Sequence, residues 1–89
     1  MLNVDYDHRS DVLYLSKGKP VPCISEQEED GLLLRISLET DEPVGVTILM
    51  YRKWAPYRAM LAKRIAQLLN LRVEDARNVL RSIDNENNA

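Results

Sequence analysis

The chain has 89 residues, of which 45% are hydrophobic and 29% charged, with a formal net charge of −2. This length supports one domain with one core, and the ordinary composition excludes a disordered chain. No apolar run approaches the roughly 20 residues that cross a bilayer, and the N-terminus lacks a basic-then-apolar signal, so we expect a cytoplasmic protein without membrane contact.

The first predicted element is a β-hairpin close to the N-terminus. Leu2, Val4 and Tyr6 alternate with polar residues, which is the period-2 pattern of a strand with one buried face. The polar residues 7–11 then favour a turn, because Asp and Ser side chains hydrogen-bond the nearby backbone. Residues 12–15 resume as a β-prone run that is apolar on both faces.

A weaker third strand is predicted at residues 21–26. Pro20 and Pro22 interrupt it, and because proline cannot donate to a sheet ladder, this strand should be short, bulged or at an edge. The acidic run that follows ends in Asp30-Gly31, a dipeptide typical of hairpin turns. A solvated turn is therefore expected there.

Two further strands follow, at residues 32–38 and 44–50. Gly45 lies inside the second of them, which suggests a bulge or a close approach of another group. Alternate positions of both strands are apolar and should face the core. The expected core residues are Leu32, Leu34, Ile36, Leu38, Val44, Val46, Ile48 and Met50.

The C-terminal third predicts two amphipathic helices. Pro56 suits a first helical turn, and Asn70 can adopt the left-handed conformation that often ends a helix. A second helix should begin near Arg72. The apolar residues at helical spacing are Tyr57, Met60, Leu61, Ile65, Leu68 and Leu69 in the first helix, and Val73, Ala76, Val79, Leu80 and Ile83 in the second.

These elements predict an α+β fold, in which a five-stranded antiparallel β-meander carries two C-terminal helices on one face or on a partner chain. Residues 1–89 should form a single domain. Its parts are a β-sheet portion at 2–51, a helical arm at 55–83 and a frayed polar tail at 84–89.

Charge divides at the end of the sheet. Residues 1–51 hold four Lys or Arg against ten Asp or Glu, a net charge of −6, whereas residues 52–89 hold eight against four, a net charge of +4. An acidic sheet therefore carries a basic helical arm.

Several short motifs in the sheet portion resemble a known family. They are Tyr6-Asp7, Asp11, Leu13-Tyr14-Leu15, Asp30-Gly31 and Val44-Gly45-Val46. In this order they are similar to the small bacterial and archaeal domain of unknown function 2283, over about residues 2–51. The resemblance implies a small bacterial protein without an established activity. Members look like companions of toxin-like neighbours in some genomes, which implies an antitoxin-type role.

No catalytic, cofactor or metal site is predicted. Asp5, Asp7, Asp11 and His8 are closely spaced and would suit a hard cation, but they lack the pattern of a calcium-binding loop and fit a turn better. No nucleophile is placed beside His8, so we do not expect an enzyme. Cys23 is expected to act as a small apolar strand residue.

Two surfaces of the helical arm are candidates for partner binding. The second helix has its own apolar stripe, so a dimer or partner interface is predicted at Val73, Ala76, Leu80 and Ile83. A basic partner-binding face is predicted at Arg58, Lys63, Arg64, Arg77 and Arg81.

The expected function is a non-enzymatic protein–protein interaction or regulatory module, homodimeric, with a further protein partner possible. Basic arms of one chain would meet the acidic sheet of the other. The alternative is an antitoxin-like DNA-binding autoregulator, because residues 65–81 resemble a helix-turn-helix unit with a basic excess. Glu74 and Asp75 would, however, face phosphates in the first turn of its reading helix.

Overall fold

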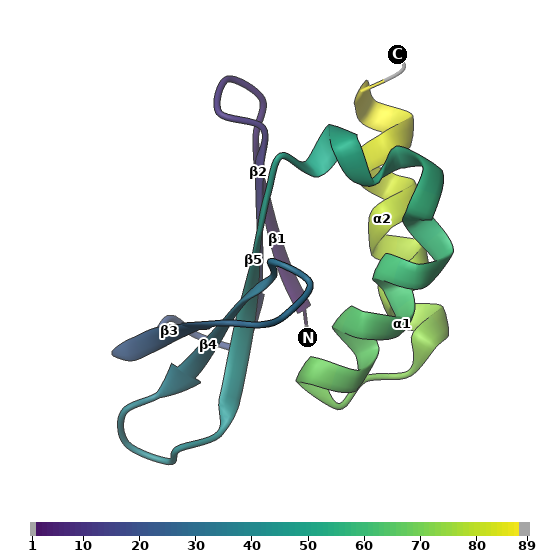
Figure 1. The fold of residues 1–89 in the computed structure, drawn as a ribbon. Coiled ribbons are helices and arrows are strands. Elements are labelled where there is room, and N and C mark those ends of the chain that lie inside the picture. Colours follow the sequence, from purple (N-terminus) through teal and green to yellow (C-terminus); the bar gives the residue numbers. More distant parts are fainter. Residues whose placement is uncertain (1, 88–89) are drawn as a thin grey trace.

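A computed structural model describes residues 2–87 of the chain. It confirms the α+β class, with one five-stranded antiparallel sheet and two C-terminal helices (Figure 1). A 3-10 helix, η1, links the sheet to the helices. The elements are β1 (Leu2–Asp7), β2 (Val12–Lys17), β3 (Cys23–Gln27), β4 (Leu33–Ser37), β5 (Pro43–Leu49), η1 (Tyr51–Tyr57), α1 (Arg58–Leu69) and α2 (Val73–Asn87).

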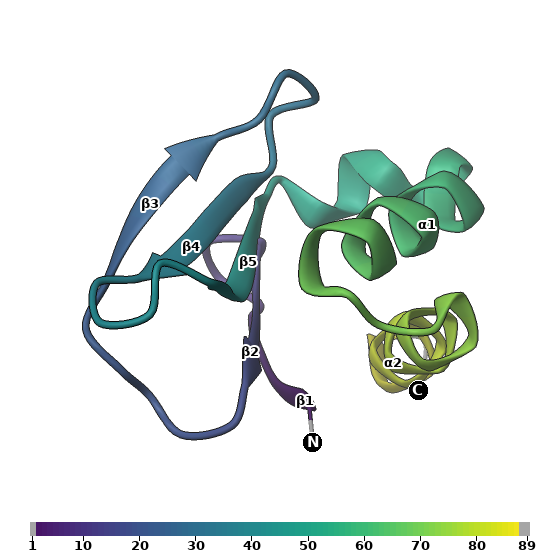
Figure 2. The ribbon, with the colours of Figure 1, turned by 90° about the horizontal axis from the view of Figure 1, so that it is seen from below.

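The strand order corrects the predicted meander, in which each strand would lie beside the next. The observed order is β1-β2-β5-β4-β3, so the last strand lies in the centre (Figure 2). Pro20 and Pro22 prevent the segment after β2 from pairing along it, and the chain crosses to the far edge of the sheet. Val46 and Ile48 of β5 are fully buried, as suits a central strand. As predicted, β3 is an edge strand.

Both helices lie on the same face of the sheet (Figures 1 and 2). Buried side chains from β2, β4, β5, α1 and α2 form one continuous core. Alternation along each strand directs these side chains toward the helices, and no helix among residues 2–87 covers the opposite face of the sheet. The largest fully buried side chains are those of Tyr51, Leu13, Leu15, Leu32, Ile48, Leu61, Ile65, Leu69 and Val46.

Several residues predicted to be buried are exposed, each for a local reason. Leu38 lies beyond the end of β4, and Met50 adopts a left-handed φ of 52° that turns it out of β5. Tyr57 ends η1, whose three-residue turns do not continue the apolar stripe of α1. Met60 faces solvent from α1, and Val4 is exposed on the edge strand β1.

The helix ends are better anchored than the sequence indicates. Asn70 caps α1 with the predicted left-handed φ, here 54°, and the Lys17 ammonium donates to the Leu69 carbonyl at 2.9 Å. The tail predicted to be frayed from residue 84 is helical through Asn87; residues 88–89 lie outside the described part. Among residues 2–87, no helix has the length and apolar character needed to span a membrane.

Candidate functional site

The acidic cluster of the first hairpin forms a turn, as the sequence predicts. The Asp7 carboxylate accepts hydrogen bonds from the backbone N–H groups of Arg9 at 3.0 Å and Ser10 at 3.3 Å. Hydrogen bonds from Ser10 and the Arg9 N–H lower the pKa of Asp7. The imidazole of His8 packs edge-on against the Tyr6 ring, with ring centroids 4.7 Å apart. Asp7 is therefore engaged in holding the turn.

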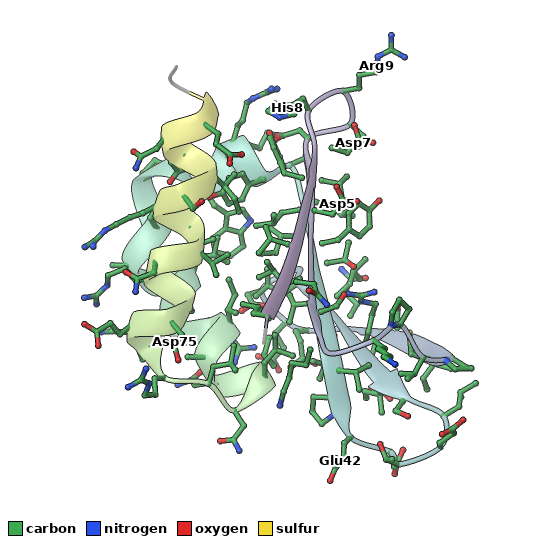
Figure 3. All side chains as sticks on the ribbon, turned by 180° about the vertical axis from the view of Figure 1, so that it is seen from behind. Asp5, Asp7, His8, Arg9, Glu42 and Asp75 are labelled. Atoms are coloured by element: carbon green, nitrogen blue, oxygen red, sulfur yellow. The ribbon has the colours of Figure 1, made fainter. Side chains whose placement is uncertain are left out.

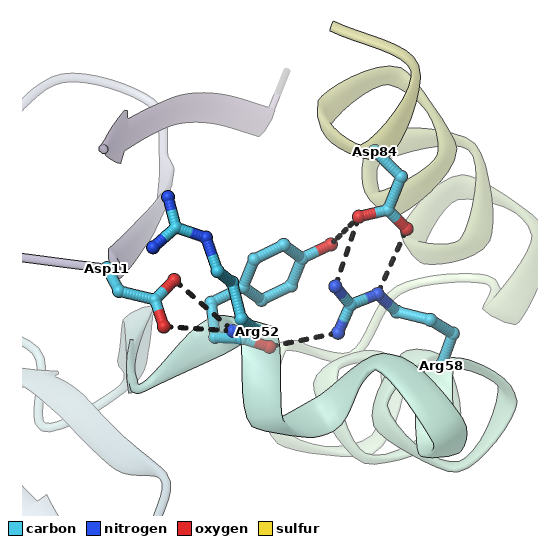
Figure 4. A network of polar contacts seen from close by, with 5 residues as sticks. Asp11, Arg52, Arg58 and Asp84 are labelled. Carbon is cyan, nitrogen blue, oxygen red and sulfur yellow. Dashed lines mark hydrogen bonds and ion pairs between the residues drawn. The ribbon is translucent and has the colours of Figure 1, made fainter. Parts of the chain in front are cut away.

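Asp11 joins this hairpin to η1. Its carboxylate accepts from the backbone N–H of Arg52 at 3.1 Å (Figure 4). It also accepts from the Tyr6 hydroxyl at 2.5 Å. Its carbonyl accepts from the Tyr51 N–H at 3.0 Å. Burial raises the pKa of Tyr6, and the hydrogen bond to Asp11 raises it further. The carboxylate thus satisfies an N–H at the start of η1, as a capping residue does.

A second set of contacts fastens α2 to η1 (Figure 4). The Arg58 guanidinium donates to the Asp84 carboxylate at 2.9 and 3.1 Å and to the Tyr51 carbonyl at 3.0 Å. It also lies 3.8 Å from the centre of the Tyr51 ring. The buried Tyr51 hydroxyl donates to Asp84 at 3.0 Å, and burial raises the pKa of that phenol strongly. Sequence alone gave no signal for this network, because its members are far apart in the chain.

The predicted basic face is divided. Arg64 points away to the β3–β4 turn, where it pairs with Asp30 at 2.6 Å and Glu28 at 3.5 Å. Lys63 is exposed on α1. The other three arginines of the face lie together around a hollow of about 320 Å³ between the helices. We call this the inter-helix groove; it is lined by Arg58, Ala59, Arg77, Leu80, Arg81 and Asp84.

The predicted apolar interface on α2 is mostly used within the chain. Ala76, Leu80 and Ile83 are buried in its own core, against α1 and the sheet. Only Val73 of the four residues is exposed, at 36%. The packing therefore leaves little of this stripe accessible to a partner.

The sheet face away from the helices, which we call the outer face, is the other large feature. Strand register places Tyr14, Thr47 and Leu33 in one row across β2, β5 and β4, and Val12 beside Leu49 at one end. Tyr14 is 38% exposed and Leu49 45% exposed. In Figure 3 the helices lie on one side of the sheet, and the sheet residues Asp5 and Glu42 lie away from them. The outer face thus presents the exposed apolar side chains of Tyr14 and Leu49 together with polar side chains, among them those of Asp5, Ser16 and Arg35.

Arg35 crosses this face over Gly45. Its Nη2 donates to the Leu15 carbonyl and to the Ser16 hydroxyl, at 2.6 Å each. A Cβ at Gly45 would collide with the Arg35 guanidinium and would lie 2.6 Å from the Leu15 carbonyl oxygen. The close approach that the glycine predicts is therefore confirmed, and the approaching group is Arg35.

Two of the four residues considered as metal ligands, and judged to fit a turn better, make structural contacts. Asp7 holds the turn and Asp11 binds Tyr6 and the backbone of Arg52. Within residues 2–87, no group of three or more His, Cys, Asp or Glu side chains is arranged to hold a metal ion. Cys23 is half-buried on β3 with a free thiol.

Comparison with known proteins gives one match. A family model described as "Protein of unknown function (DUF2283)" matches residues 3–50, more than half of the chain. No curated protein and no solved structure matches. The matched segment covers the five strands and ends before η1, so the helical layer lies beyond it.

Proposed function

The chain belongs to the DUF2283 family, and because this family is described by its unknown function, we propose a function from the structure itself. The protein is a non-enzymatic interaction module that acts as a homodimer through the outer face of its sheet. The acidic turn supports the non-enzymatic part, because Asp7 and Asp11 are engaged in structural hydrogen bonds.

The uncovered outer face is the observation that carries this proposal. An antiparallel sheet can expose one face to water, but that face is then usually polar. Here Tyr14 and Leu49 are exposed apolar side chains on neighbouring strands, and Leu33 lies in the row of Tyr14 with the buried Thr47 between them. Contiguous exposed apolar surface is typical of protein–protein contacts. A second copy would cover it with the same face, as two-fold symmetry requires.

This proposal moves the homodimer contact from α2 to the sheet. The apolar stripe of α2 is occupied by the chain's own core, so it cannot also bind a partner without unfolding the helical layer. The outer face is free of that constraint.

Light scattering tests the homodimer. The wild-type chain should have about twice its monomer mass of 10.3 kDa at micromolar concentration. The double variant Tyr14→Lys/Leu49→Lys should be monomeric, because it places two charges in the apolar contact. Met60→Lys is the matched control, since Met60 is 57% exposed on α1, and it should stay dimeric. A wild-type monomer, or dissociation by Met60→Lys alone, would contradict the proposal.

The alternative function, an antitoxin-like DNA-binding regulator, would use the basic face. That face is smaller than the sequence indicates, because Arg58 and Arg64 are each paired with carboxylates. The first turn of α2 also carries Glu74 and Asp75. A gel-shift titration at low salt decides between the two functions. If the protein retards duplex DNA, and if replacing Arg77 and Arg81 abolishes this retardation, the regulator is favoured.

A further inference from the structure

Two arginines of α2, Arg77 and Arg81, differ from three other arginines of the helical layer. Arg58, Arg64 and Arg72 each pair with a carboxylate, at 2.9, 2.6 and 3.2 Å. In the part of the chain that the structure describes, Arg77 and Arg81 make no such pair, although both line the inter-helix groove. They stand one helical turn apart and are exposed.

This arrangement is unfavourable for the isolated chain. Like charges four residues apart in a helix repel each other, and Arg77 and Arg81 have this spacing. The one carboxylate in the groove, that of Asp84, is already held by Arg58 and by the Tyr51 hydroxyl. The groove therefore presents two arginines that form no ion pair within residues 2–87, beside one carboxylate that is already engaged.

We propose that the inter-helix groove binds an acidic helical segment of another protein. Two carboxylates one turn apart on a partner helix have the same spacing as Arg77 and Arg81, so both ion pairs form in one orientation. Ala59 has a small side chain on the α1 side of the groove and allows a helix to approach closely. The contact resembles the general mode in which a helix lies in a groove.

A second copy of the chain does not fit this groove. Acidic side chains of the sheet portion lie in different places: Glu42 lies in the turn before β5, away from α2 (Figure 3), whereas Asp30 pairs with Arg64 of α1. A copy that docked with them would bind head to tail. Head-to-tail contacts add further copies into an open chain of subunits unless the rotation between subunits closes a ring.

Nucleic acid also fits less well than an acidic helix. A phosphate backbone carries negative charge along its whole length, and it would pass the Asp84 carboxylate, which lines the groove. The sheet portion, with its net charge of −6, adds long-range repulsion. A peptide helix can place carboxylates opposite the two arginines and neutral residues elsewhere.

The test uses the full chain and a synthetic peptide. The probe is an alanine-rich helix with glutamates four residues apart, and the matched peptide carries glutamine at those positions. Binding is followed by amide NMR shifts of the labelled protein. The glutamate peptide should shift amides of α2 around Arg77 and Arg81, and the glutamine peptide should bind at least tenfold more weakly.

Variants separate the groove from general charge attraction. Arg77→Gln/Arg81→Gln should weaken binding at least tenfold, whereas Arg9→Gln, at the exposed tip of the first hairpin, should not change it. The proposal would be overturned if Arg77→Gln/Arg81→Gln and Arg9→Gln bound the glutamate peptide equally well. It would also be overturned if that peptide shifted no amide signals of α2. Tighter binding of a short DNA duplex to the same residues would also overturn it. None of these results depends on the dimer mass, which tests the outer face separately.

Discussion

Gly45 shows how one residue type can be required by a side chain from another strand. Arg35 reaches over it to the Leu15 carbonyl and the Ser16 hydroxyl, and no other residue would leave room for the guanidinium. The valine-glycine-valine motif in the sheet thus has a structural explanation. Its glycine lets an arginine lie flat across the central strand.

We predict that Gly45→Ala destabilises the fold by about 1–3 kcal/mol, the usual cost of forcing a methyl group into a filled site. The added Cβ meets the Leu15 carbonyl oxygen, which belongs to the backbone and cannot move aside easily. The urea midpoint of unfolding measures this. Adding Arg35→Ala should restore only part of the loss, and full recovery would show that the side chain is the sole obstacle.

Sequence patterns predict some residues with special structural roles and miss others. A glycine within a strand signals a close contact, and Asn70 signals a helix end; both are confirmed. The left-handed φ values of Asp11 and Met50 could not be anticipated, because they follow from tertiary contacts. Asp11 is held there by Tyr6 and the backbone of Arg52, which alternation along a strand does not reveal.

At the scale of elements, the β3–β4 turn is fastened to α1 by one ion pair. Arg64 binds Asp30, which also accepts a hydrogen bond from the Leu32 N–H. Burial alone would raise the pKa of Asp30, but Arg64 and this N–H outweigh it and hold the pKa below 3.8. The ionised carboxylate therefore stabilises the folded state.

This shift fixes the direction of the pH dependence. Stability from the pair is present above pH 3.8 and is lost as the pH falls through the lower folded pKa of Asp30. Asp30→Asn should therefore flatten the acid limb of a plot of unfolding free energy against pH. Arg64→Gln should flatten it similarly, and the double variant should add little. Additive effects of the two changes would show that the pair does not couple.

The hydrogen bonds that join Asp84 of α2 to Tyr51 of η1 and to Arg58 lead to a prediction for hydrogen exchange. Asp84→Ala removes the acceptor of Arg58 and of the buried Tyr51 hydroxyl, and should cost on the order of 1 kcal/mol or more. The last turns of α2 should then exchange their amides faster, while β5 stays protected. Asn85→Ala, an exposed neighbour in the same helix, is the control. Unchanged exchange in α2 would mean that core packing alone holds this end.

Element types were predictable, but their ends and connections were less so. Alternation identified β1, β4 and β5, a β-prone run identified β2, a weaker signal indicated β3, and helical spacing identified α1 and α2. The 3-10 helix η1 was missed because its three-residue turns produce neither period. The strand order could not be predicted from the sequence pattern either, because alternation shows which face of a strand is buried but not which strands are neighbours.

The whole molecule has two layers with different surfaces. The helical layer covers one face of the sheet, leaves open the outer face with Tyr14 and Leu49, and carries the inter-helix groove with Arg77 and Arg81. The split of charge between sheet and arm, which the sequence predicts, thus corresponds to two layers. These surfaces support the proposal of an interaction module with a homodimer contact on the sheet and a separate partner contact on the helices.

NMR shifts on dilution test the homodimer contact most directly. As the labelled chain is diluted through the dissociation range, the amide signals of Tyr14, Leu33 and Thr47 should move together, because these residues form one row of the outer face. Signals around Arg77 and Arg81 should stay in place. Shifts confined to α2, or signals unchanged at every concentration together with a monomer mass, would contradict a dimer built on the outer face.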